Sequence, residues 1–191
     1  MPLGKTDEAR TEILAAYEID PVSENMVLGR FAILESRGTY DEGLKLADEF
    51  LRENKNNSFA GRAYATFLYH TGDFRKVIEL GEQALEKRGR LNVFGWLSLL
   101  SASYHKTGNF DKAEETLKRL ETLSREDTKA LYSSAMNYAE MGRHDEAISA
   151  LQKCFDAHEE RMVWVKAEPR FANLRNDESF HEILRKMKFI N

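Results

Sequence analysis

Few residues of this chain have side chains whose type and spacing could do chemistry. The sequence holds five histidines and one cysteine: His70, His105, His144, His158, His181 and Cys154. None of them stands at the spacing of a zinc motif, and the glycines are too far apart for a phosphate-binding loop. No serine or carboxylate is tied to a base, as nucleophilic catalysis needs. We therefore expect no catalytic residue, no metal and no cofactor, and we interpret the chain as a non-enzyme.

The elements that would position any functional residue are marked by five regularly spaced glycines. Gly4, Gly38, Gly72, Gly108 and Gly142 are separated by steps of 34, 34, 36 and 34 residues. Such a period indicates one structural unit stacked on itself. Each glycine falls between two stretches with helical apolar spacing. A glycine there can take the left-handed conformation that ends one helix and turns the chain into the next.

The residues after these glycines are similar from unit to unit. Gly142-Arg-His-Asp-Glu-Ala147 and Gly108-Asn-Phe-Asp-Lys-Ala113 both put a small residue five positions after the glycine, and Gly4-Lys-Thr-Asp-Glu-Ala9 does the same. This pattern resembles the tetratricopeptide repeat, a helix–turn–helix unit whose helices touch at small residues. The resemblance covers residues 4 to about 160. Pentatricopeptide and Sel1-like repeats have nearby periods, but their columns fit less well.

The resemblance implies an all-α fold, a right-handed α-solenoid of helix–turn–helix repeats with a C-terminal capping helix. We expect a single domain over 1–191. Its parts are predicted in this order: a half repeat at 4–22, repeats at 24–57, 58–92, 94–127 and 128–161, and a cap at 162–191.

Two departures from the repeat pattern predict close packing. Phe31 is large where other units have Ala or Ser, and its own unit has Gly43 where others have Ala or Val. We predict that Gly43 makes room for the ring of Phe31. Gly81 lies inside a predicted helix, where it costs about 1 kcal/mol relative to Ala. It has two interpretations, sequence drift or the close approach of a neighbouring helix.

The two ends of the chain lead to different expectations. After Pro169, Asn176 or Asp177 can cap a last helix whose stripe of Phe180, Ile183, Leu184 and Met187 closes the final repeat. This tail is similar to those of bacterial multidomain proteins with such repeats. At the other end Gly4 leaves no room for a first helix. We expect a fragment of a longer protein, or self-association of the uncovered helix into a homodimer.

Composition excludes several other classes of protein. The net charge is −4, with 28 basic and 32 acidic residues spread along the helices, which argues against nucleic-acid binding. No apolar run approaches the length of a membrane span. Cys154 falls in an apolar column, so we interpret it as a buried packing residue. A single cysteine favours a reducing compartment, and we expect a cytoplasmic protein.

The repeat provides a surface for binding, because the first helix of each unit lines the concave side of a solenoid. We expect this groove to bind a protein or peptide, with aromatic, Met and Arg side chains as anchors. The candidate residues are Leu28, Phe59, Arg62, Thr66, Tyr69, His70, Ser98, His105, Tyr132 and Met136. Two alternatives stay open. These faces could simply be solvated, or the chain could be the C-terminal regulatory or scaffold domain of a bacterial signalling enzyme or transcription regulator, acting on its own parent domains.

Overall fold

The computed structural model describes residues 11–12, 15, 24–55, 57–86 and 93–190. Within them the chain forms helices and no strand. The elements are α2 (Glu24–Ser36), α3 (Tyr40–Glu53), α4 (Ser58–Thr71), α5 (Phe74–Glu86), α6 (Val93–Lys106), α7 (Phe110–Leu123), α8 (Thr128–Glu140), α9 (His144–Asp156), the 3-10 helices η1 (Glu160–Trp164) and η2 (Pro169–Leu174), and α10 (Glu178–Lys186). The predicted half repeat and its homodimer contact fall mostly outside the described residues.

The regularly spaced glycines that the structure describes end the first helix of each pair, as predicted. Gly38, Gly72, Gly108 and Gly142 have φ of 70°, 92°, 79° and 74°. The amide after each glycine donates to the carbonyl five residues back, over 2.8 to 3.0 Å. This is the hydrogen bond that closes a helix C-terminus around a left-handed residue. Each pair is therefore joined by a tight turn in which the glycine takes the left-handed conformation.

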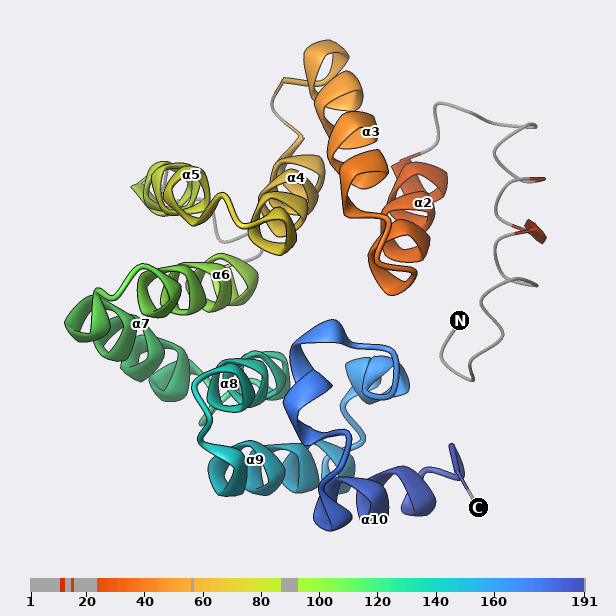
Figure 1. The fold of residues 1–191 in the computed structure, drawn as a ribbon, viewed down its shortest axis with the longest axis vertical. Coiled ribbons are helices and arrows are strands. Elements are labelled where there is room, and N and C mark those ends of the chain that lie inside the picture. The colour runs from red at the N-terminus through yellow and green to blue at the C-terminus, as the bar shows by residue number, and fades with distance from the viewer. Residues whose placement is uncertain (1–10, 13–14, 16–23, 56, 87–92, 191) are drawn as a thin grey trace.

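Successive helices pack against one another and curl into the predicted all-α solenoid, which looks like an open ring when viewed down its shortest axis (Figure 1). The small residues five positions after each glycine lie at the helix contacts: Gly43, Val77, Ala113 and Ala147 are all buried. Cys154 is fully buried in the last cluster of the core, as predicted, and burial raises the pKa of its thiol to about 12.

One predicted contact is wrong, and one of the two interpretations of Gly81 is confirmed. The ring over Gly43 belongs to Phe67 of the following repeat and not to Phe31, since a Cβ on Gly43 would lie 2.3 Å from the Phe67 ring. Phe31 instead meets Phe67 edge to face, with the ring centroids 6.0 Å apart. A Cβ on Gly81 would lie 2.7 Å from Leu100 of α6. Gly81 therefore marks a close helix approach and not drift.

The segment after α9 does more than close the end of the solenoid. Asp177 caps α10 by accepting from the amides of Ser179 and Phe180, and the predicted stripe packs on the last repeat. Residues 160–174, however, fold back along the inner side of the curve and lie beside α8 (Figure 1). Phe171 and Leu174 are buried there. The inner wall is thus built from two sources, the repeat helices and the chain's own C-terminal segment.

Candidate functional site

A hollow of about 470 Å³ opens on the inner side of the ring. Its wall includes residues of α2, α4, α6, α8 and the segment 160–170. Six of the residues predicted for the groove line it: Arg62, Thr66, His70, Ser98, Tyr132 and Met136. The first helices therefore face the concave side, as the repeat pattern predicts.

The other four predicted residues do not line the hollow. Tyr69 is buried outside the lining, with its ring 5.3 Å from that of Phe74 and its hydroxyl bonded to Glu140. His105 lies against Phe110 at the same centroid distance, 5.3 Å. Phe59 sits in the first turn of α4 outside the lining. The side chain of Leu28 lies outside the described part of the structure.

Sequence reasoning missed the part of the wall that comes after α9. Glu160, Arg161, Trp164, Glu168 and Arg170 all line the hollow. The signal for this segment in the sequence is weak. Pro169 interrupts the helical pattern, and apolar residues are mixed with basic residues on either side of it. Where such a segment lies depends on contacts far away in the sequence, so its register could not be read from local spacing.

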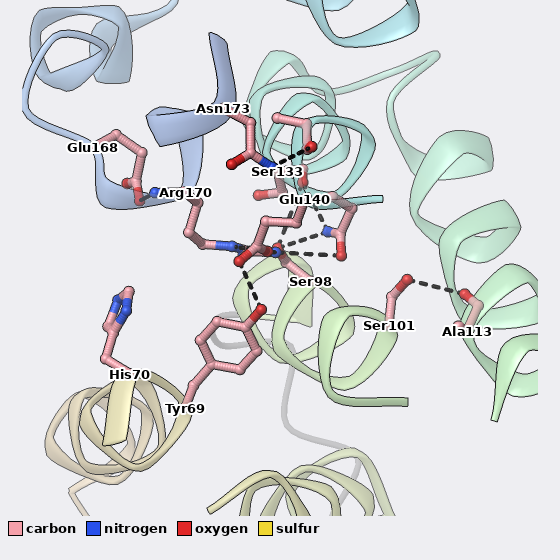
Figure 2. A network of polar contacts seen from close by, with 12 residues as sticks. Tyr69, His70, Ser98, Ser101, Ala113, Ser133, Glu140, Glu168, Arg170 and Asn173 are labelled. Carbon is pink, nitrogen blue, oxygen red and sulfur yellow. Dashed lines mark hydrogen bonds and ion pairs between the residues drawn. The ribbon is translucent and has the colours of Figure 1, made fainter. Parts of the chain in front are cut away.

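Arg170 joins three repeats at the floor of the hollow (Figure 2). Its Nη1 donates to Ser98 Oγ of α6 over 2.7 Å, and its Nε donates to Glu140 Oε2 of α8 over 2.5 Å. The third donor, Nη2, reaches Asn137 Oδ1 at 3.3 Å. Tyr69 of α4 donates to the other oxygen of Glu140 over 2.6 Å, and its ring lies 5.5 Å from the guanidinium carbon. The buried charge of Arg170 is thereby paired and hydrogen-bonded, which its burial demands.

A second arginine from the same segment, Arg161, is also held in the wall by several contacts. Arg161 lies over the ring of Tyr132, 4.7 Å from its centroid, and donates to Ser133 Oγ over 3.2 Å and to the carbonyl of Lys129. Its Nε also donates to Glu159 over 3.1 Å. Burial raises the pKa of Glu159, but hydrogen bonds from Thr128 and Arg161 outweigh it and hold that pKa below its usual range. Arg161 is therefore a fixed part of the wall.

Three polar groups in the wall have no hydrogen-bond partner among the described residues. The Tyr132 hydroxyl and His70 Nε2 are both buried and unbonded. His70 stacks on Tyr40 with ring centroids 4.4 Å apart, and its Nε2 lies 3.5 Å from Glu35. The third group is the guanidinium of Arg62, whose stem lies against Gly95 and whose pKa is lowered by burial.

Glu168 faces the same space from the C-terminal segment. It caps η2 by accepting from the amide of Arg170 over 3.1 Å. Burial, and then the negative charge of Glu35, raise its pKa to about 7. The arrangement can hold a ligand through directed polar contacts. Among the described side chains no group of His, Cys, Asp and Glu could hold a metal ion.

Comparison with known families agrees with the helical pairs nearest the C-terminus. The model of the family described as Tetratricopeptide repeat matches residues 97–127 and 128–159, which is α6 to α9. No curated protein matches the sequence. Tetratricopeptide repeats generally mediate protein–protein interaction and are typically not catalytic. Across the part of the chain that the structure describes, no helix has both the length and the apolar character needed to cross a membrane.

Proposed function

We propose that the hollow on the concave face binds a segment of a partner protein, without catalysis. The observation that carries this proposal is the set of unbonded polar groups in its wall. A buried polar group that lacks a partner costs about 1–3 kcal/mol. The Tyr132 hydroxyl and His70 Nε2 are the buried groups without a partner, and both residues line the hollow together with Arg62, whose guanidinium makes no hydrogen bond among the described residues. A bound segment can offset that cost by supplying their partners.

The composition of the wall supports a peptide as the ligand. Phe94, Trp164 and Met136 give it apolar surface between the charged groups. Aromatic side chains, Met and Arg are enriched where proteins bind one another. Extended or helical segments can reach such a site because it is open on the inner side of the ring.

The test is to fill the hollow and measure peptide binding. A library of random peptides displayed on phage is selected against the wild-type chain. Selected peptides are then measured against Ala32→Trp, which places a bulky side chain in the wall, and against Ala157→Trp as the control. Ala157 is exposed and lies outside the lining. Binding should be lost with Ala32→Trp and kept with Ala157→Trp. Peptides that bind both variants equally would show that the hollow is not the site.

A further inference from the structure

The charged groups of the hollow are separated along the helix axes. Because each tight turn reverses the chain, α4, α6 and α8 run parallel. Arg62 lies near the N-terminal end of α4, and His70 lies eight residues later. With a rise of about 1.5 Å per residue, these two levels are about 12 Å apart. The hollow therefore has two ends, and they differ in charge.

The end at the helix N-termini is basic. Arg62, Arg161 and Lys129 lie there, together with Glu160. Arg161 is paired with Glu159, and Lys129 with Glu160 at 3.0 Å. Arg62 makes no hydrogen bond or ion pair among the described residues. Burial lowers its pKa, the positive charge of Arg161 lowers it further, and the carboxylates Glu35 and Glu168 offset only part of this. The positive ends of the helix dipoles lie at the same level. The group at this end that still lacks a partner is the Arg62 guanidinium, a cation.

The opposite end is acidic. Glu35 and Glu168 both line it, beside His70. Arg170 is close by, but its guanidinium is engaged by Glu140, Ser98 and Asn137. Among the described residues, the ion pair of Glu35 is with His70, whose Nε2 lies 3.5 Å from it. Glu168 accepts from a backbone amide, and the two carboxylates repel each other. This end carries the charge of Glu35 and, above about pH 7, also that of Glu168, with the negative ends of the helix dipoles beside it.

We propose that the hollow takes a segment of a partner protein that carries one acidic side chain for Arg62 and one basic side chain for Glu35 and Glu168. In an extended chain each residue spans about 3.3–3.6 Å, so about 12 Å corresponds to a spacing of three or four residues. This inference rests on the proposed function and names the chemistry of the partner.

The experiment repeats the selection with variants that change the charge of one end. The displayed peptides are fused through their C-termini, so no terminal carboxylate is offered. The wild-type chain should enrich peptides with Asp or Glu three or four residues from Lys or Arg. Arg62→Glu should bind these peptides about tenfold more weakly or worse, and should itself enrich a basic residue in the acidic position. The double variant Glu35→Gln, Glu168→Gln should lose the preference for the basic residue alone.

The control is Arg75→Glu, an exposed arginine of α5 that does not line the hollow. It carries the same change in net charge and should select the wild-type pattern. Folding of each variant is checked by circular dichroism. If Arg62→Glu does not fold, Arg62→Gln replaces it and should lose the acidic preference without inverting it.

The outcomes separate the inference from the proposed function. Peptides that need the open hollow but show no paired charges would overturn the inference and leave the function standing. Unchanged selection by Arg62→Glu would do the same. A library from which no peptide depends on the hollow would contradict both.

Discussion

Neighbouring repeats are held together by different interactions in the two halves of the solenoid. In α6 to α9, a tyrosine four residues before the turn glycine ties each repeat to the one before it. Tyr104 donates to Glu82 of α5 over 2.5 Å, and Tyr138 donates to Glu121 of α7. A cation covers each ring, Lys112 at 5.1 Å from its centroid and Arg143 at 4.7 Å.

In α2 to α5 the same position holds leucine, Leu34 and Leu68. The first two repeats meet instead through an aromatic contact, where Phe67 of α4 fills the space above Gly43 of α3. The comparison teaches that a repeat interface can depend on shape or on polar pairing. The family model matches the half that uses the polar pairing.

Arg170 connects α6 and α8 with Tyr69 of α4, so it joins the two halves through buried charge, and removing it should have the largest effect. Arg170→Ala leaves the mostly buried Glu140 without its charged partner, and breaking a buried ion pair in this way costs about 3–5 kcal/mol. Arg143→Ala is the matched control, because Arg143 pairs with Glu146 and Glu114 at the partly exposed surface. It should cost at most about 1 kcal/mol. Urea denaturation measures both, and equal costs would show that Arg170 does not join the halves.

The apolar interface of the first half should be sensitive to a single methyl group. Gly43→Ala places a Cβ within 2.7 Å of three Phe67 ring atoms, and that ring is buried. Overpacking of this kind costs about 1–3 kcal/mol. Gly61→Ala in α4 meets nothing within 4 Å and should stabilise by about 0.5–1 kcal/mol.

The second variant, Phe67→Leu, decides whether Gly43 acts through that ring. Combined with Gly43→Ala it should cost less than the sum of the two single changes, because the smaller side chain leaves room for the methyl group. The free energies of unfolding in urea give the comparison. Additive costs would place the strain of Gly43→Ala somewhere else.

The sequence predicted those features of the fold that depend on residues close together in the chain. The turn glycines and the Asp177 cap are local, because left-handed backbone and capping bonds are settled within a few residues. The partner of Gly43 is not, since Phe31 and Phe67 both belong to neighbouring helices. Choosing between them requires the rotation of each helix about its axis. The sequence period does not contain that rotation.

The candidate site shows the same division. Arg62, Ser98 and Tyr132 line the hollow because the helical period fixes their face. Tyr69 and His105 do not, and their rings pack on Phe74 and Phe110 instead. The contribution of Arg161, Glu168 and Arg170 could not be predicted, because it depends on a fold-back of the chain across the inner face. That fold-back is held by contacts such as Arg170 to Ser98, which are 72 residues apart.

The smallest expected effect concerns one polar joint of the second half. Tyr104→Phe removes the hydrogen bond to Glu82 but keeps the ring, and should cost about 0.5–1.5 kcal/mol at neutral pH. The hydrogen bond from Tyr104, and then Lys112, hold the pKa of Glu82 below its usual value of 4.5. A carboxylate with a lowered pKa stabilises the fold above its unfolded pKa, and that contribution is lost as the pH falls through the folded value. The difference between wild type and Tyr104→Phe should therefore shrink in acid, as measured by urea denaturation at several pH values. A difference that stays constant with pH would mean that the ring of Tyr104, and not its bond to Glu82, joins these repeats.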